Sequence, residues 1–193
     1  MIRIEEAATA EQLDAVRSRF RTFVAWHHAT PVDDRRLIAR YFDQAAFEAE
    51  LRDLPGAYAG PKGGLLLGWI GKGPANLTPA SLTPANLTPA NLTPANLTPA
   101  GCVALRDLGD GVCEMKRMFV LPQVQRQGLG LQLADRNIAT ARAAGWLAMR
   151  LDTSKRQIPA IKLDERFGFT RVESHSPLTP DLADWLVFFE KTL

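Results

Sequence analysis

Apolar positions near the start of the chain recur at helical spacing. After a short strand expected at residues 2–6, Thr9 and Gln12 match a capping box ahead of the first apolar residue of a helix. The apolar positions that follow fall on one helical face: Leu13, Val16, Phe20, Phe23 and Val24. We therefore expect a first helix that ends near residues 30–31.

A second helix is expected before the Pro55-Gly56 stop. Asp33 or Asp34 can cap its N-terminus. Its apolar positions are Leu37, Tyr41, Ala45, Phe47 and Leu51.

Apolar runs separated by turn residues predict the other elements. Strands are expected at residues 63–70, 101–108, 112–121, 146–153, 169–173 and 184–190. One helix should follow the glycine-bearing loop near residue 128, and another should cover residues 158–167. The resulting order, β-α-α-β-β-β-α-β-α-β-β, predicts a single α+β domain over residues 1–193, with a mixed sheet of about seven strands and four helices.

A repeat interrupts this order between the second and third strands. Residues 76–100 are five tandem copies of Asn/Ser-Leu-Thr-Pro-Ala, and proline at every fifth position forbids a continuous helix. In the frame A-N-L-x-x the run also resembles pentapeptide-repeat proteins, but five copies make barely more than one such coil. Because lengthening a loop to this extent costs only about 1.8 kcal/mol of closure entropy, we predict a dispensable low-complexity loop at residues 74–100.

Composition excludes several function classes. The 193 residues are 46% hydrophobic and 23% charged, which suits one packed domain. A net charge of +2 is too small to argue for nucleic acid or an anionic membrane as partner. The chain has no apolar run of 18 residues and no signal-peptide profile at its start, so we expect a cytoplasmic protein.

The two cysteines flank a predicted hairpin turn at Gly109-Asp110-Gly111. Such a hairpin places Cys113 opposite roughly Arg106 and Cys102 opposite roughly Arg117. The two cysteines then lie about 13 Å apart along the strands, at roughly 3.3 Å per residue. That separation is too large for a disulfide, so we expect two reduced thiols.

Residues 112–145 carry the main chemical signal. An apolar strand stops at Pro122, and a glycine-bearing loop then opens a helix that Gly145 ends. Unpaired backbone N–H groups and the helix dipole make such an N-terminus an anion site. The loop residues are Gln125, Arg126, Gln127, Gly128, Leu129 and Gly130.

This pattern differs from a dinucleotide-binding loop, because Leu133 stands where a third glycine would be required. A Q/R-x-x-G-x-G/A loop after a strand ending in V-x-P instead resembles the acetyl-CoA loop of GNAT-type N-acetyltransferases. The resemblance covers residues 101–169 well and the last strand loosely. It implies that acetyl-CoA is the acyl donor and that a small-molecule amine is the acceptor. The spacing of the polar residues named below for the acceptor pocket suggests no metal site.

The resemblance also implies a site. The loop residues named above would hold the CoA pyrophosphate. The backbones of Met118, Phe119 and Val120, on a bulged strand, would face the thioester. This strand would splay from its neighbour, residues 147–152, to admit the pantetheine arm.

Glu114, on the same strand, is the candidate base. A glutamate with a pKa near 4.3 takes a proton from an amine with a pKa near 10 only at a cost of roughly 8 kcal/mol, unless the environment brings the two pKa values closer together. The alternative is a carboxylate that pairs with Lys116, two residues along the same strand face.

Asp164 stands where the family pattern N-x-x-A-x-x-L-Y-x-x-x-G-F has its tyrosine acid, and Gln157 replaces the asparagine. An ionised aspartate cannot donate a proton to a leaving thiolate and would repel it. Three hypotheses remain. The thiolate leaves unassisted, Asp164 faces away from the site, or the protein binds CoA without rapid turnover.

The acceptor pocket is expected between the first two helices and residues 174–184. Its polar candidates are His27, His28, Asp33, Asp34 and His175. The main alternative to an acetyltransferase is a non-catalytic acyl-CoA-binding or sensor protein, and a third is an interaction module that uses the repeats. A homodimer is left open.

Overall fold

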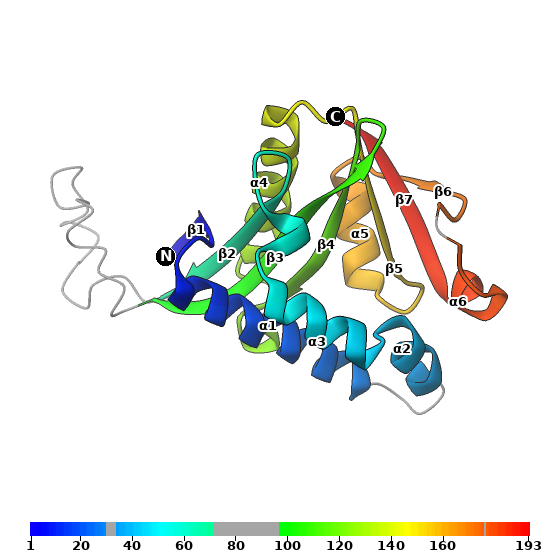
Figure 1. Cartoon of the computed structure of the whole chain (residues 1–193), viewed down its shortest axis with the longest axis horizontal. Coiled ribbons are helices and arrows are strands. Elements are labelled where there is room, and N and C mark those ends of the chain that lie inside the picture. Colours follow the sequence, from blue (N-terminus) through cyan, green and yellow to red (C-terminus); the bar gives the residue numbers. More distant parts are fainter. Residues whose placement is uncertain (30–33, 72–96, 176) are drawn as a thin grey trace, which may run out of the picture.

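A mixed seven-stranded sheet forms the centre of the molecule, with strand order β1-β2-β3-β4-β5-β7-β6. The computed structural model describes residues 1–29, 34–71, 97–175 and 177–193. Neighbouring strands are antiparallel except β4 and β5, which are parallel. The predicted α+β fold and strand number are confirmed (Figure 1).

The elements are β1 (Ile2–Glu6), α1 (Ala10–His28), α2 (Arg35–Tyr41), α3 (Gln44–Asp53), η2 (Gly56–Tyr58), β2 (Gly64–Ile70), β3 (Thr98–Gly109), β4 (Val112–Val120), η7 (Pro122–Val124), α4 (Leu129–Ala143), β5 (Ala148–Ser154), α5 (Ile158–Arg166), β6 (Thr170–Val172), α6 (Pro180–Trp185) and β7 (Leu186–Thr192).

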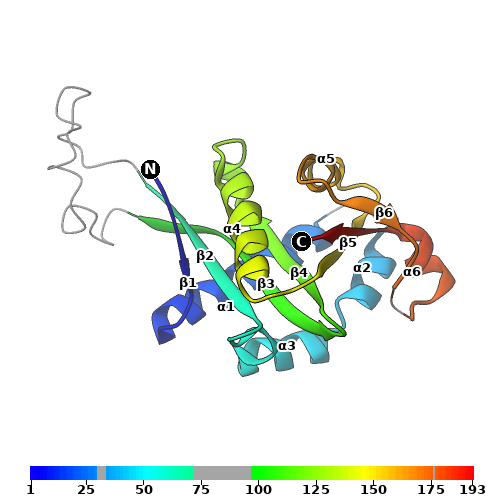
Figure 2. The ribbon, with the colours of Figure 1, turned by 90° about the horizontal axis from the view of Figure 1, so that it is seen from above.

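Helices cover both faces of the sheet. Figure 2 shows α4 and α5 on one side, and α1, α2 and α3 on the other. Residues of β3 alternate between the two cores. Cys102 and Ala104 pack with the first helices, whereas Val103 and Leu105 pack with α4. Because successive strand residues point to opposite faces, a sheet covered twice needs this nearly continuous apolar run.

The capping box predicted for α1 is confirmed. The Thr9 hydroxyl accepts from the Gln12 backbone N–H (3.3 Å), and the Gln12 side chain accepts from the Thr9 N–H (2.9 Å). Val16 and Phe20 are fully buried against the sheet, as the helical spacing predicts.

The expected single helix before Pro55 is wrong, because two helices lie there. The chain leaves helical geometry at Phe42, and Asp43 starts α3 by accepting a hydrogen bond from the Ala46 N–H (2.8 Å). Asp34 precedes α2 but makes no capping bond. The chain also forms a helix, α6, at Pro180–Trp185, where the sequence pattern predicts none, so the last strand starts at Leu186 and not at residue 184. Within the described residues there are thus six α-helices, not four.

The third strand starts earlier than expected, inside the last repeat. Thr98, Pro99 and Ala100 belong to β3, Ala100 is 1% exposed, and the Pro99 carbonyl accepts from Arg19 Nη1 (3.3 Å). The predicted loop therefore does not reach residue 100. Residues 72–96, which hold the rest of the repeats, lie outside the described residues.

Both thiols are free and buried, which confirms the expectation of no disulfide. Cys113 lies opposite Asp107, and Cys102 lies opposite Phe119. The expected partners were Arg106 and Arg117. The pairing differs by one residue at Cys113 and by two at Cys102, because the ladder between β3 and β4 contains two irregularities.

Within the part of the chain that the structure describes, every helix is too short or too polar to cross a membrane.

Candidate acyl-donor and acceptor site

The parallel strands β4 and β5 pair over three residues only. Their ladder runs from Val112 opposite Ala148 to Glu114 opposite Arg150. Beyond it, β4 continues to Val120 with β3 as its sole strand partner among the described residues. That part of β4 therefore presents a backbone edge toward β5 without strand pairing, as the predicted splay requires.

A bulge lies on this unpaired part of β4. Cys102 pairs with Phe119 and Ala104 pairs with Lys116, so two residues of β4 lie opposite Val103 alone. One of them, Arg117, has a φ of +55°, a left-handed conformation uncommon for a residue with a side chain. The bulged strand implied by the family resemblance is thus present.

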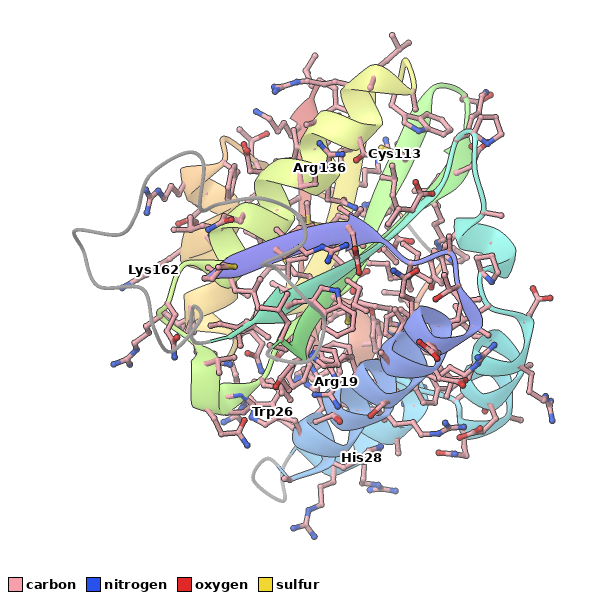
Figure 3. All side chains as sticks on the ribbon, turned by 90° about the vertical axis from the view of Figure 1, so that its left-hand side faces the viewer. Arg19, Trp26, His28, Cys113, Arg136 and Lys162 are labelled. Atoms are coloured by element: carbon pink, nitrogen blue, oxygen red, sulfur yellow. The ribbon has the colours of Figure 1, made fainter. Side chains whose placement is uncertain are left out.

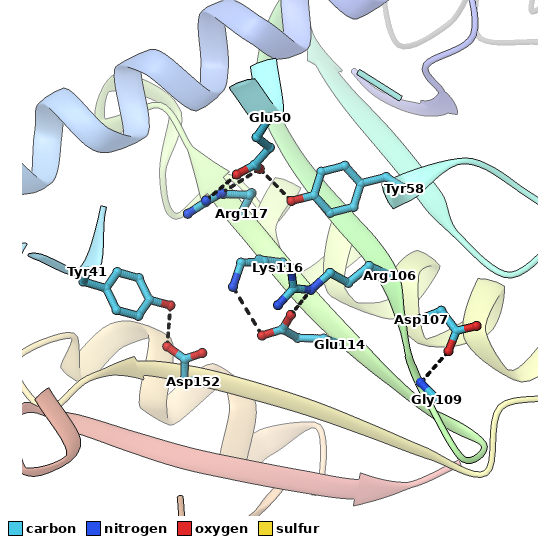
Figure 4. Close-up of polar contacts among 10 residues, drawn as sticks. All are labelled: Tyr41, Glu50, Tyr58, Arg106, Asp107, Gly109, Glu114, Lys116, Arg117 and Asp152. Atoms are coloured by element: carbon cyan, nitrogen blue, oxygen red, sulfur yellow. Dashed lines mark hydrogen bonds and ion pairs between the residues drawn. The ribbon is translucent and has the colours of Figure 1, made fainter. Parts of the chain in front are cut away.

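The Arg117 side chain is anchored at several points. Its Nε and Nη2 donate to the two carboxylate oxygens of Glu50 on α3 at 3.0 and 2.6 Å, and Tyr58 also donates to Glu50 (2.6 Å) (Figure 4). The guanidinium lies 5.3 Å from the ring centroid of Phe42 and 5.5 Å from that of Phe47. Burial alone would lower the pKa of Arg117, but the hydrogen bonds and charge of Glu50 hold it above its usual value.

The glycine-bearing loop leads directly into α4. Gly128 occupies the N-cap with a φ of +89°, and no side chain caps this end of the helix. The N–H groups of the first turn therefore have no intrahelical acceptor and are available to an anion. Arg126 also has a positive φ, +63°, and Gln125 Nε2 donates to the Val120 carbonyl (3.1 Å), which ties the loop to the end of β4.

The predicted cofactor residues differ in what they expose. The side chains of Phe119 and Leu129 are 5% and 1% exposed and belong to the core, so only their backbones can meet a ligand. Met118 and Val120 are partly buried against the α4 core. Arg126 and Gln127 are exposed on the loop.

Glu114 is 4% exposed and lies between two cations. Its Oε2 is paired with Arg106 Nε, and its Oε1 lies 3.3 Å from Lys116 Nζ (Figure 4). The pairing with Lys116, left open from the sequence, is therefore present, and Arg106 adds a second contact. Both carboxylate oxygens are therefore already engaged by cations, which leaves less acceptor capacity for the proton of an amine and disfavours the use of Glu114 as a base.

A second carboxylate, missed from the sequence, lies at the same opening. Asp152 is two residues beyond the last β4–β5 pair, and its Oδ1 accepts from the Tyr41 hydroxyl on α2 (2.5 Å). Burial, followed by the charge of Asp152, raises the pKa of Tyr41 well above its ordinary value, so Tyr41 remains a donor. Among the described residues, no other group bonds the Asp152 carboxylate.

Asp164 lies on α5 and is 7% exposed, with no hydrogen bond or ion pair to its carboxyl from any described residue. Burial, with a smaller contribution from Glu165, raises the pKa of Asp164 to about 7. This shift favours the protonated form of the carboxyl, whereas the sequence alone predicts an ionised aspartate.

The remaining polar candidates are scattered. His27 is buried, and burial together with the charges of His28 and Arg117 lowers its pKa to about 4. His28 is exposed at the end of α1 (Figure 3). Asp34 pairs with Arg156 (2.7 Å).

His175 lies nearer the opening, with its ring against Phe188 on β7, the residue paired with Asp152. Burial, and then the charge of Arg150, lowers the pKa of His175. Asp33 lies outside the described residues. Across the described ranges, no group of three His, Cys, Asp or Glu residues is arranged to hold a metal.

Comparison with known proteins relates part of this chain to one protein family. Residues 81–169 match the model of the acetyltransferase (GNAT) family. An uncharacterised N-acetyltransferase of Schizosaccharomyces pombe is 38% identical over 81 residues, which are 40% of this chain and 50% of that protein. An IAA acetyltransferase of Azospirillum brasilense is 37% identical over 94 residues, 48% of this chain and 60% of that protein. The matches thus span about half the length of these relatives.

The fold is also found among solved structures. The PaiA N-acetyltransferase of Thermoplasma acidophilum, determined in complex with coenzyme A, is similar over 100% of this chain and 99% of its own, with a TM-score of 0.64 and 14% identity. At this identity, the likeness concerns the fold.

Proposed function

We propose that this chain, which matches the acetyltransferase (GNAT) family over residues 81–169, transfers an acetyl group from acetyl-CoA to the amine of a small molecule. One observation carries the proposal. A bulged, unpaired edge of β4 is followed directly by the uncapped N-terminus of α4. A thioester and a pyrophosphate need these two features in this order along one ligand.

The acyl donor would lie along β4. The amides of residues 127–130 would bind the pyrophosphate, with the charge of Arg126 beside it. The pantetheine arm would then run along the unpaired edge, where the backbones of Met118, Phe119 and Val120 would hydrogen-bond the arm and the thioester carbonyl. The coenzyme A in the related Thermoplasma structure supports this ligand class.

Asp164 would supply the acid. The acceptor nitrogen attacks the acetyl carbonyl carbon, the carbon–sulfur bond breaks, and the departing sulfur takes a proton from the Asp164 carboxyl. A cationic amine first gives a proton to water so that its nitrogen can attack, the nitrogen loses a second proton to water after the attack, and the Asp164 carboxylate regains a proton from water before the next turnover. Two observations support the assignment. The pKa of Asp164 is raised to about 7 by burial, and α5 packs in the same apolar cluster as Met115 and Leu151, the residues just beyond the last β4–β5 pair.

The acceptor would approach from the face that bears α1 and α2. Asp152, held by Tyr41, has carboxylate capacity left for an amine, whereas Glu114 has both oxygens in ion pairs. We therefore assign amine orientation to Asp152, and to Glu114 a role in keeping the charges of Arg106 and Lys116 balanced.

Thiol release distinguishes this function from the sensor alternative. Purified protein with acetyl-CoA and a panel of small amines should release CoA faster with at least one amine than without any, and the amine should gain an acetyl group by mass spectrometry. Tight binding of acetyl-CoA with no amine-dependent release across the panel would favour the sensor.

A further inference from the structure

Arg117 combines two unusual properties in one residue. Its backbone has a φ of +55° within a strand, and its side chain is 9% exposed and ion-paired with a helix residue 67 positions away in sequence. A left-handed conformation in a non-glycine residue costs about 1–3 kcal/mol and persists only where the surroundings fix it. The strand pairs on either side of the bulge hold its ends, and the contacts of the Arg117 side chain hold its centre.

These contacts come from different elements and converge on the guanidinium. Glu50 on α3 binds it through two parallel hydrogen bonds, and Tyr58 on η2 holds Glu50 from the other side. The rings of Phe42, at the end of α2, and Phe47, on α3, lie against the guanidinium. Two hydrogen bonds to one planar guanidinium fix its orientation as well as its distance from the carboxylate, which a single hydrogen bond would not do.

The bulge lies next to the backbone groups that the proposed mechanism uses. Met118, the second bulged residue, follows Arg117 directly, and the Arg117 carbonyl receives a weak bond from the Cys102 thiol (3.6 Å). A bulge re-aims the groups that follow it, so any relaxation at Arg117 would turn the amides offered to the thioester.

We propose that the Glu50–Arg117 pair is a positioning device: it locks the β4 bulge so that the backbone after Arg117 is aimed at the acyl carbonyl. This inference rests on the proposed acetyl transfer. It gives α3, which lies outside the unit formed by β4, the glycine-bearing loop and α4, a direct influence on the reaction rate. Arg117 itself touches neither donor nor acceptor in this account.

Two double variants test the role of the backbone. Arg117→Gly/Glu50→Gln and Arg117→Val/Glu50→Gln both remove the ion pair without leaving a buried charge. Glycine adopts a positive φ freely, whereas a β-branched residue does not. The glycine variant should retain kcat within about threefold, and the valine variant should lose about tenfold or more, equal to about 1.4 kcal/mol in the barrier. The Kd for acetyl-CoA should change little in either, because the pyrophosphate site is intact.

Glu50→Gln alone supplies a measurement that does not depend on the valine variant folding. It should lower kcat with Kd for acetyl-CoA unchanged. Glu48 lies on the same helix as Glu50 and forms an exposed ion pair with Arg21 on α1. Glu48→Gln removes that pair and should change neither kcat nor the Kd for acetyl-CoA. Equal rates in folded glycine and valine variants, or an unaltered kcat in Glu50→Gln, would overturn the inference. A wild-type protein that neither binds nor turns over acetyl-CoA would instead refute the proposed function.

Discussion

Two glycines with nearly the same backbone lie at opposite ends of α4. Gly128 has a φ of +89° before the helix, and Gly145 has a φ of +81° after it. Neither position is crowded. A Cβ at Gly128 would come no closer than 3.9 Å to its neighbours, and one at Gly145 would meet nothing within 4 Å. A side chain at either position should thus cost similar backbone strain, about 1–3 kcal/mol.

Only Gly128 belongs to the proposed pyrophosphate site. Gly128→Val should weaken acetyl-CoA binding by about tenfold or more, about 1.4 kcal/mol, because the side chain occupies the approach to the loop amides. Gly145→Val should lower the free energy of unfolding by about as much as Gly128→Val does, about 1–3 kcal/mol, with no effect on the affinity for acetyl-CoA. Calorimetry on both folded variants makes the comparison, and equal affinities would remove Gly128 from the site.

The raised pKa of Asp164 gives the reaction a pH dependence. The protonated carboxyl is the proposed donor, so kcat should fall as pH rises through about 7. Asp164→Asn should lower kcat and remove that fall, whereas Asp164→Tyr should restore a donor that stays protonated to higher pH. Steady-state rates between pH 6 and 9 decide the matter, and a pH profile unaffected by Asp164→Asn would refute the assignment.

The same group affects stability. Because burial raises the folded pKa of Asp164, its contribution is fully present below the unfolded pKa, near 4, and is lost as pH rises through about 7. Asp164→Asn should therefore be more stable than wild type at pH 8, by up to about 4 kcal/mol. Denaturant unfolding at pH 5 and pH 8 measures the difference, and no gain at pH 8 would contradict the burial argument.

At the scale of elements, the separated ends of β4 and β5 lie at the proposed acceptor side. Asp152→Asn keeps the hydrogen bond from Tyr41 but removes the charge, so the KM for a cationic amine should rise about tenfold with little change in the Kd for acetyl-CoA. Lys155→Ala/Asp184→Ala, which removes an exposed ion pair beyond the end of β5, is the control. A KM that is unaltered in Asp152→Asn would exclude Asp152 from amine binding.

Local sequence signals predicted the strand, loop and helix of the proposed donor half, because the causes of these elements are local. Pro122 ends the strand and Gly128 starts the helix, and the backbone conformations that these residues favour do not depend on residues far away in the sequence. The break between α2 and α3 was missed although Asp43 is a strong N-cap residue, since the apolar spacing continues through it.

The acceptor half could not be derived in this way. Tyr41 and Asp152 are 111 positions apart, and Glu50 and Arg117 are 67 positions apart, so only the tertiary fold brings each pair together. The raised pKa of Asp164 likewise comes from burial, which the sequence pattern of α5 does not specify.

At the scale of the whole molecule, residues 98–100 of the last repeat copy are part of β3. Replacing residues 74–100 would remove the start of β3 and the buried Ala100, so we now expect that change to destabilise the protein. A replacement ending at residue 96 remains predicted to leave the melting temperature and acetyl-CoA affinity unaltered. Differential scanning calorimetry on the two versions compares them directly, and a fall of several degrees for the shorter replacement would show that the repeats contribute to stability.

The central claim is that one ligand spans the β4 bulge and the N-terminus of α4. Amide hydrogen exchange with and without acetyl-CoA tests it most directly, because bound amides exchange more slowly. Protection is expected in residues 118–120 and 127–130 together, with no change at the β3–β4 turn around Asp110. Protection absent from both segments, or found at the turn instead, would contradict the account.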